Sequence, residues 1–486
     1  MKGGVFLRTR LLLYLLGWIA IAAGASLLLP VPISAAEGDG LCWAFVLSAA
    51  ALLLPGVCAV RAGRGHPERL LVREGACFLV GIWIILTGTA ALPYLLTGTL
   101  SFADAWAEGV SGITTTGLTL LAADAPRVLI FWRSLTQWLG GACIILLLLT
   151  VVPQVSEWFG MSLVMPRGQR ASQLLSSMRK ISRRVMGIYV GATAVAAAIF
   201  TALGLSVFDA VNLSMVTLAT GGCYTPKTGG ESPLYYLALM AMMLFSAGNF
   251  FFYAEMVRRR ELSADDAGAK EMRAMLRFAA AAGLLVSLHL WISGTYGGSE
   301  SLRKGFFAAA AFLSTTGMDP VQLAGWPDFD RFVLILLIFI GGCIASSAGG
   351  LKILRLSVLA NAAIEELRRT LHSRMVLRVS ALGRVVPLSM VGQLLSFFAL
   401  YTAVFFGAAM ALSLGGMAPL SALGLSAACL TSAGPAALLA GDVGVYASMG
   451  EGWRLFCCAL MLLGRLEVFS FLFVIQTLFS RWEGRW

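Results

Sequence analysis

The stretch SFADAWAEGVSGITTTG, at residues 101–117, has three counterparts further along the chain. Each counterpart joins small and apolar residues to a final turn that contains Thr or Ser and ends in glycine, and these glycines recur about every 100 residues. The counterparts are SVFDAVNLSMVTLATGG at 206–222, SLRKGFFAAAAFLSTTG at 301–317 and APLSALGLSAACLTSAG at 418–434. A fourfold internal repeat therefore organises the chain.

Each stretch has the pattern of a short helix that ends at a glycine turn. Ser101 with Asp104, and Ser206 with Asp209, have the spacing of helix-capping residues, and Ser301 lies at the matching position of the third stretch. Glycine has a free φ, which lets backbone carbonyls turn toward one axis. The C-terminal end of a helix is partly negative, and carbonyl oxygens can replace the hydration shell of a monovalent cation. The pattern predicts four re-entrant loops lining a cation pathway.

The composition is that of a membrane protein. Of the 486 residues, 58% are hydrophobic and 13% are charged, and the mean hydropathy is +0.83. Soluble domains have about 25% charged residues, so lipid must be the solvent for most of this surface. Three histidines and nine scattered cysteines form no metal-binding or disulfide pattern, and no phosphate-binding loop motif occurs. We therefore expect no cofactor.

Ten apolar segments are long enough to cross a bilayer. They lie at 11–29, 41–60, 75–96, 128–152, 185–205, 233–257, 274–294, 331–355, 386–414 and 455–480. An even number places both termini on one side of the membrane. With cytoplasmic termini, the cytoplasmic segments hold 28 of the 36 Lys and Arg residues and the outer segments hold seven, a strong positive-inside bias. All four glycine-ended stretches then face outward. Contact with anionic lipid explains the net charge of +11, so no nucleic-acid partner is implied.

The first apolar segment allows a second interpretation. It follows a basic N-terminus and precedes Ala35–Ala36, as a cleaved signal peptide would. It is longer than the signal-peptide hydrophobic region of about 7–15 residues, which favours an uncleaved first helix.

Two features predict a constriction in the pathway. Arg465 lies near the middle of the last apolar segment, where an arginine costs about 3 kcal/mol or more. The sequence GGCIASSAGG, at 341–350, interrupts an apolar run with small residues, as in a broken helix that lines a cavity. Each feature has a simpler interpretation. Arg465 can pair with a carboxylate on a neighbouring helix, and the small residues can serve close helix packing.

Over essentially all of residues 1–486, the chain resembles the membrane subunits of the Trk/Ktr/HKT superfamily of potassium transporters, and within it the bacterial TrkH type. The resemblance rests on the four stretches and on FWRSLTQWLGGACII at 131–145, FIGGCIASSAGGLKILR at 339–355 and MLLGRLEVF at 461–469. It implies an all-α polytopic membrane protein with four pseudo-symmetric helix–pore-loop–helix repeats around one pore, plus two extra N-terminal transmembrane helices. The extra helices would occupy 1–66 and the repeats 67–165, 166–262, 263–372 and 373–486.

The resemblance also implies a potassium selectivity filter built from one short segment of each repeat. These segments are Thr115-Thr116-Gly117, Thr220-Gly221-Gly222, Thr315-Thr316-Gly317 and Ser432-Ala433-Gly434. A glycine at the position of Gly117 goes with potassium rather than sodium among relatives. Two features depart from the family pattern. The fourth loop continues as Pro435-Ala436 after Gly434, where relatives commonly have Asn-x-Gly-Pro-Gly, and Asp319 follows the third segment.

The same resemblance implies a gate, a location and partners. Arg465 would act as a cation barrier below the filter, together with an intramembrane loop formed by Gly341, Gly342, Ala345, Ser346, Ser347, Ala348, Gly349 and Gly350. The implied function is potassium uptake across the bacterial inner membrane by a homodimer with a cytosolic, nucleotide-binding regulatory ring of the TrkA type. A less selective K⁺/Na⁺ transporter or a cation-coupled symporter of the same superfamily is the alternative.

Two other classes of protein fit the sequence less well. An enzyme embedded in the membrane would need paired carboxylates or a Ser/His set at membrane depth, and the ionisable residues there are too few. A carrier with inverted repeats would place its repeats in opposite orientations. The four glycine-ended stretches are instead expected on one face, so we expect a transport protein that is not an enzyme.

Overall fold

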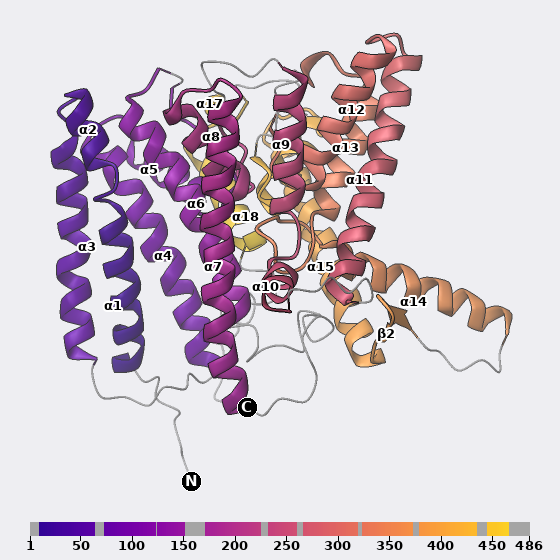
Figure 1. Cartoon of the computed structure of the whole chain (residues 1–486), viewed down its shortest axis with the longest axis horizontal. Helices are drawn as coiled ribbons and strands as arrows, with labels where there is room; N and C mark the ends of the chain where they lie inside the picture. The colour runs from indigo at the N-terminus through magenta and orange to yellow at the C-terminus, as the bar shows by residue number, and fades with distance from the viewer. Residues whose placement is uncertain are drawn as a thin grey trace.

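The computed structural model describes residues 9–63, 72–122, 124–150, 171–224, 232–259, 266–318, 323–372, 379–434 and 445–465. Within these ranges almost all regular structure is helical (Figure 1). The exception is a two-residue antiparallel pair, β1 (Ser380–Ala381) and β2 (Arg384–Val385), in which Ser380 lies opposite Val385 and Ala381 opposite Arg384. The predicted all-helical class is confirmed.

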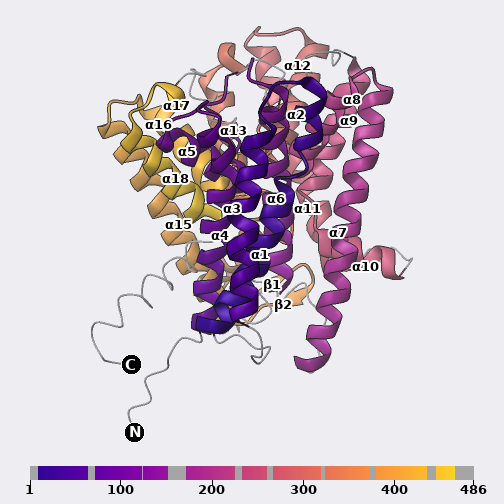
Figure 2. The ribbon, with the colours of Figure 1, turned by 90° about the vertical axis from the view of Figure 1, so that its left-hand side faces the viewer.

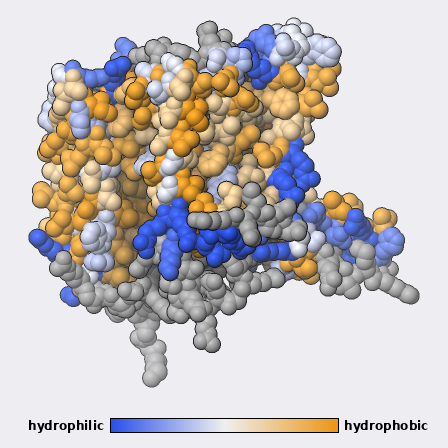
Figure 3. Space-filling model, in the orientation of Figure 1, coloured by the Kyte–Doolittle hydropathy of each residue, from blue (hydrophilic) through white to orange (hydrophobic). Residues whose placement is uncertain are grey.

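Seven spans in the described ranges are long and apolar enough to cross a membrane. They are α1 (Thr9–Ser26) continued by the short α2 (Val31–Glu37), α3 (Cys42–Ala62), α4 (Val72–Leu96), α6 (Arg127–Thr150), α7 (Ala171–Ala202), α11 (Ala267–Ile292) and α15 (Leu388–Leu414). Hydrophobic side chains form a broad band across the face shown in Figure 3, and hydrophilic side chains gather above and below that band. This distribution is the one expected of a chain whose sides face lipid.

Close backbone contact fixes the first two long helices against each other. A Cβ added at Gly17 of α1 would come within 2.9 Å of the Gly56 carbonyl oxygen of α3, and a Cβ at Gly56 would come within 3.1 Å of the Gly17 carbonyl oxygen. Small residues at facing positions allow helices to approach closely in lipid. The pair lies beside α4 at the front of Figure 2.

Four shorter helices lie among the long ones, in the upper half of Figure 2. They are α5 (Phe102–Ile113), α8 (Val207–Leu218), α12 (Gly298–Leu313) and α16 (Pro419–Thr431). Each falls within one of the four repeated stretches or overlaps its beginning. The last residues of all four helices are buried, so the four C-terminal ends lie inside the molecule.

Two predicted crossings are broken. The segment 233–257 is divided into α9 (Pro233–Ser246) and α10 (Phe250–Arg259), which meet at an angle of 90°. The segment 331–355 holds α13 (Asp328–Ile340), the irregular stretch 341–352 and the first residues of α14 (Ile353–Leu371), which extends sideways beyond the long helices in Figure 1. The predicted crossing at 233–257 is therefore bent at Ala247–Asn249, and the predicted interruption after residue 340 is confirmed.

The described residues test the prediction of ten crossings only in part. Counting α9 and α10 as one bent span gives at most eight within the described residues. Only part of the predicted segment 455–480 is described, as α18 (Glu451–Arg465), which follows the short α17 (Val445–Ser448). A 3₁₀ turn, η3 (Leu323–Gly325), precedes α13. The proposed repeat boundaries fall within or at the edge of segments outside the described residues.

The short helices and their neighbours form a closed ring of packed elements. In order, the contacts run from α5 to α6, α8, α9, α12, α13, α16 and α18, and α18 packs against α5 again. The last described helix therefore completes the ring that the first short helix begins. This closure brings the four glycine turns to the middle of the molecule.

Candidate ion pathway

Two of the four short helices begin at the predicted capping residues. The Ser101 hydroxyl oxygen accepts the Asp104 backbone N–H at 3.2 Å, and the Ser206 hydroxyl oxygen accepts the Asp209 backbone N–H at 3.1 Å. Capping of this kind stabilises a helix by about 1 kcal/mol. The third helix begins three residues before Ser301, at Gly298, and Ser301 donates its hydroxyl to the Tyr296 carbonyl at 3.1 Å instead. The capping prediction is confirmed for α5 and α8.

All four short helices end in the same backbone turn. The residue two positions before each aligned glycine has a left-handed φ of 55–58°, at Thr115, Thr220, Thr315 and Ser432. This conformation is uncommon for any residue with a side chain and a clear outlier for a β-branched one. A strained backbone that recurs at four equivalent positions points to a functional requirement. We call Thr115–Gly117, Thr220–Gly222, Thr315–Gly317 and Ser432–Gly434 the first to fourth turn segments.

Close approach between turn segments explains why glycine is needed. A Cβ at Gly117 would collide with the Gly221 carbonyl oxygen, which brings the first segment against the second. The Gly434 backbone N–H donates to the Thr116 carbonyl at 2.6 Å, which joins the fourth segment to the first. A Cβ at Gly434 would collide with that same carbonyl oxygen. The first, second and fourth turn segments thus come together although about 300 residues separate the first from the fourth.

The side-chain oxygens within and directly before the first and third turn segments are neutral hydroxyls. Thr114 directly precedes the first segment, and its hydroxyl is 2.8 Å from that of Thr116; Ser314 directly precedes the third, and its hydroxyl is also 2.8 Å from that of Thr316. The described part of the chain contains no group of three or more His, Cys, Asp or Glu residues that could hold a metal ion. Carbonyl and hydroxyl oxygens suit a monovalent cation that must bind and leave quickly.

The small-residue loop, 341–350, touches the ends of three short helices. The Ser347 hydroxyl donates to the Leu218 carbonyl at 3.0 Å, at the last residue of α8. The Gly349 backbone N–H donates to the Thr315 hydroxyl at 2.9 Å, and a Cβ at Gly349 would collide with the Thr431 carbonyl oxygen at the last residue of α16. The predicted gate residues of this loop are buried (Gly341, Gly342, Ala345, Ser346, Ser347, Ala348) or half-buried (Gly349, Gly350).

Arg465 connects the first turn segment to this loop. Its Nη2 donates to the Thr115 hydroxyl at 2.5 Å and to the Ser347 carbonyl at 2.9 Å, and the residue is only 5% exposed. Among the described residues no carboxylate lies within ion-pair distance of Arg465, so the simpler interpretation, a charge paired on a neighbouring helix, has no partner there. Glu467 and Asp319 lie outside the described residues.

The opposite side of the loop is held by the bend between α9 and α10. The Cys343 backbone N–H donates to the Ala247 carbonyl at 2.9 Å, and the Phe250 backbone N–H donates to the Ala345 carbonyl at 3.1 Å. Ala247 and Phe250 flank the bend, so the bend exposes the backbone groups that the loop needs. The two broken helices therefore stabilise each other.

One buried carboxylate secures this junction, and the sequence analysis missed it. Glu271, at the start of α11, is fully buried and accepts the Ile344 backbone N–H at 2.7 Å with one oxygen. Its second oxygen accepts the Asn249 side-chain amide at 3.0 Å. In the sequence, Glu271 stands in the polar region before an apolar segment, where a carboxylate normally faces water, so no local signal marked it.

The fold and the site define a polytopic helical membrane protein in which re-entrant helices end inside the membrane around neutral oxygens. This is the architecture of a transport protein rather than of an enzyme. A model of the TrkH family, described as cation transport proteins, matches residues 56–480, and the chain belongs to this family. The prediction of the family and the prediction that the chain is not an enzyme are both confirmed.

Individual relatives agree with this assignment. The chain is 28% identical over 483 residues to the Trk system potassium uptake protein TrkH of Halomonas elongata, covering 97% of this chain and 99% of the relative. It is 30% identical over 428 residues to TrkG of Escherichia coli K12, covering 85% and 86%. The crystal structure of the potassium transporter TrkH from Vibrio parahaemolyticus superimposes with a TM-score of 0.84 at 26% identity, covering 96% and 98%.

Proposed function

We propose that this protein takes up potassium across the bacterial inner membrane through a channel-like pathway. The observation that carries the proposal is the left-handed turn that recurs at the ends of all four short helices. Relatives that match nearly the full length of the chain are named as potassium uptake proteins. The membrane potential alone favours potassium entry by about 2.3 kcal/mol per 100 mV.

The four turn segments form the selectivity filter in this proposal. Carbonyl oxygens from Thr115 to Gly117 and from the three equivalent segments replace water around a partly dehydrated potassium ion. The packed ring of helices supports four pseudo-symmetric repeats around one pore, preceded by two additional N-terminal helices. Gly117 favours potassium in this arrangement, because glycine here goes with potassium transport among the relatives that the chain resembles.

The small-residue loop and Arg465 form the gate. The loop bonds to the ends of the short helices, and Arg465 joins the loop to the Thr115 hydroxyl. A guanidinium below a cation filter repels the ion on its exit path. Opening requires the hydrogen bonds of the loop and of Arg465 to break.

The charge bias along the sequence supports cytoplasmic termini and an outward-facing filter. A homodimer and a cytosolic, nucleotide-binding ring of the TrkA type are the partners in this proposal, because the chain has no nucleotide-binding motif of its own and resembles membrane subunits that work in this way. Lipid contacts the hydrophobic band (Figure 3).

A less selective K⁺/Na⁺ transporter, or a cation-coupled symporter, is the second candidate. Ser432 and Ala436 favour it, since relatives commonly have Asn at the first of these positions and Gly at the second, and Asp319 after the third turn segment favours it as well. The two candidates differ in how strongly sodium competes with potassium, so one assay separates them.

The test is uptake of radioactive rubidium into liposomes that contain the purified protein, in competition with potassium, sodium or lithium. Competition by potassium and not by sodium supports the proposed filter. Equal competition by sodium contradicts potassium selectivity and favours the second candidate. No uptake by folded protein, either in the wild type or with Arg465→Ala, contradicts the channel-like pathway.

Arg465→Ala tests the gate in the same liposomes. We expect faster uptake than in the wild type, because both hydrogen bonds of Nη2 and the positive charge are lost. The control is Arg303→Ala, which removes an exposed arginine that lies 5.0 Å from the centre of the Tyr236 ring. Equal rates for the Arg465 and Arg303 variants contradict the gate assignment and leave the filter assignment in place.

A further inference from the structure

Arg133 of α6 joins the chain that follows the first turn segment to the chain that follows the second. Its Nη1 donates to the Thr119 hydroxyl at 3.1 Å, and its Nη2 donates to the Cys223 carbonyl at 2.9 Å. Thr119 follows Gly117 by two positions, and Cys223 directly follows Gly222. A planar guanidinium holds two acceptors in a fixed relation, which a lysine ammonium cannot do. Arg133 therefore spans the outer ends of the first and second turn segments.

The Thr119 hydroxyl makes three hydrogen bonds. It accepts from Arg133 and from the Leu121 backbone N–H at 3.1 Å, and it donates to one Glu108 carboxylate oxygen at 2.9 Å. The other Glu108 oxygen accepts the Leu120 backbone N–H at 2.7 Å. Because Glu108 belongs to α5, the helix that leads into the first turn also holds the chain that leaves it.

This carboxylate is specific to the first repeat. Glu108 is only 3% exposed and stands nine positions before the aligned glycine Gly117. Leu213, Ala308 and Leu425 stand at the same position before the other three aligned glycines. A buried carboxylate is expensive unless it is hydrogen-bonded, so a single one with two fixed acceptor oxygens points to a specific task.

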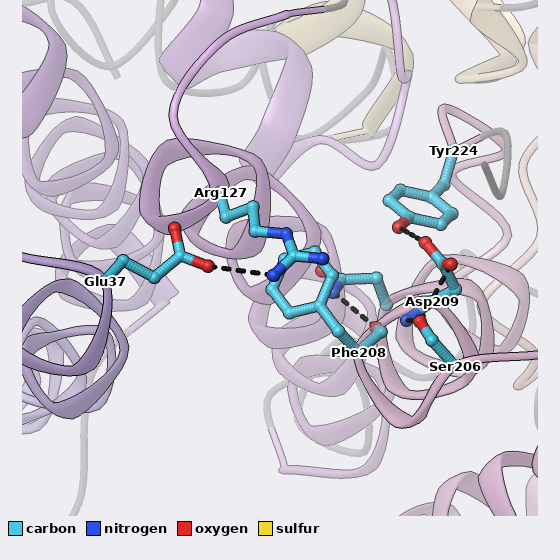
Figure 4. Close-up of polar contacts among 7 residues, drawn as sticks. Glu37, Arg127, Ser206, Phe208, Asp209 and Tyr224 are labelled. Atoms are coloured by element: carbon cyan, nitrogen blue, oxygen red, sulfur yellow. Dashed lines mark hydrogen bonds and ion pairs between the residues drawn. The ribbon is translucent and has the colours of Figure 1, made fainter. Parts of the chain in front are cut away.

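The second turn segment has an additional restraint from its own helix. The Tyr224 hydroxyl donates to one Asp209 carboxylate oxygen at 2.5 Å, and the Ser206 hydroxyl donates to the other at 2.8 Å (Figure 4). Asp209 lies in the first turn of α8. The chain after Gly222 is thus fixed at Cys223 by Arg133 and at Tyr224 by Asp209.

We propose that Arg133 and Glu108 are positioning residues that set the cation selectivity of the filter by fixing the outer ends of the first two turn segments. This inference rests on the proposed function. A ring of carbonyls favours the larger potassium ion when it resists contraction around the smaller sodium ion, or when the number of its coordinating dipoles is held constant. Both conditions require the first two segments to keep a constant separation. The Arg133 guanidinium spans that separation, because it donates to Thr119 on one side and to Cys223 on the other.

The test compares variants that weaken the hydrogen bonds of the Arg133 guanidinium with a variant of another arginine on the same helix. Arg133→Lys keeps the positive charge and loses the two-acceptor geometry. Thr119→Val keeps the shape of the side chain and loses the hydroxyl that Arg133 and Glu108 share. The control is Arg127→Lys, because Arg127 pairs with Glu37 at 3.1 Å and lies 5.1 Å from the centre of the Phe208 ring (Figure 4), without a bond to either turn segment.

In the rubidium competition assay, we expect Arg133→Lys and Thr119→Val each to reduce the preference for potassium over sodium by about five- to tenfold. Thr119→Ser should restore the preference, because it restores the hydroxyl. Arg127→Lys should leave it at the wild-type value. A role limited to stability would lower the melting temperature and leave the competition ratio unchanged.

The outcomes for the inference and for the proposed function are separate. A selective wild type whose Arg133→Lys and Thr119→Val variants remain equally selective overturns the inference and leaves potassium uptake in place. A wild type without selective rubidium uptake overturns the proposed function itself. If Arg133→Lys does not fold, the pair Thr119→Val and Thr119→Ser decides the inference, since neither changes a charge.

Discussion

The helices α6 and α13 follow the first and third short helices, yet only one of them is broken. Each has a Gly-Gly pair, Gly140–Gly141 within α6 and Gly341–Gly342 directly after α13. The first pair lies within a continuous helix, whereas Gly341 adopts a φ of +74° and ends its helix. A glycine pair alone therefore does not break a membrane helix.

The difference lies in the partners that surround each pair. Gly140 packs directly on the Ile113 carbonyl oxygen at the end of α5, where a Cβ would collide. After Gly341 the freed backbone N–H groups of Cys343, Ile344 and Gly349 find acceptors on three other elements. In lipid an unpaired backbone group is costly, so a break occurs only where neighbours satisfy it. Glycine permits the break, and the surrounding acceptors stabilise it.

Of the substitutions that test this comparison, Gly140→Ala should have the largest effect, a loss of stability. The added Cβ meets the Ile113 backbone, which cannot move without shifting the first turn segment. We expect a loss of about 3 kcal/mol in the free energy of unfolding, measured by denaturant titration in detergent. A wild-type stability for this variant would mean that α6 does not pack tightly on α5 in solution.

Glu271→Ala should weaken the broken segment instead of the continuous one. It leaves the buried Ile344 N–H without its acceptor, which costs about 2 kcal/mol and corresponds to about a thirtyfold larger population of displaced loop. Rubidium uptake by the protein alone should rise accordingly. Arg277→Ala, which removes an exposed arginine of the same helix, is the control. Unchanged uptake would show that Glu271 does not restrain the loop.

Ser347→Ala should act in the same direction with a smaller effect. The single hydroxyl is shared between the Leu218 and Ser246 carbonyls, at 3.0 and 3.1 Å. Its removal costs about 1 kcal/mol, which corresponds to about a fivefold rise in uptake. Ser347→Thr keeps the hydroxyl and should stay closer to the wild type. A larger rise than that of Glu271→Ala would reverse the order of the two restraints.

Gly187→Ala should have the smallest effect and the opposite sign. Gly187 lies in α7, and a Cβ there would meet nothing within 4 Å. Alanine is the better helix former by about 1 kcal/mol, so a small rise in melting temperature is expected. A loss of stability comparable to that of Gly140→Ala would contradict the distinction between open and packed glycines.

Much of this architecture could be predicted because it repeats. The positions of the four short helices and of the turns at Thr115, Thr220, Thr315 and Ser432 follow from one pattern used four times. The interruption after residue 340 is visible for a similar reason, since ten consecutive residues there are mostly small. Local composition was sufficient for these elements.

The missed features depend on distant partners. The bend at Ala247–Asn249 reads in the sequence as three ordinary small or polar residues in an apolar run, and it forms because the loop residues Cys343 and Ala345 bond to it. Glu108 and Glu271 are separated in sequence from the groups they hold by 12 and 73 residues. Periodicity cannot reveal such pairs, because neither partner changes the local pattern.

The bond between Arg465 and Thr115 joins residues 350 positions apart and also sets an order of assembly. Synthesis proceeds from the N-terminus, so α5 and its turn are made before α16 and α18, the elements that they contact. During that interval the Thr116 carbonyl lacks its hydrogen bond from the Gly434 N–H, and the first turn segment lacks its contact with the fourth. Insertion of α18 is therefore the step that completes the ring of packed helices, and loss of α18 would leave the Thr115 hydroxyl without its bond to Arg465.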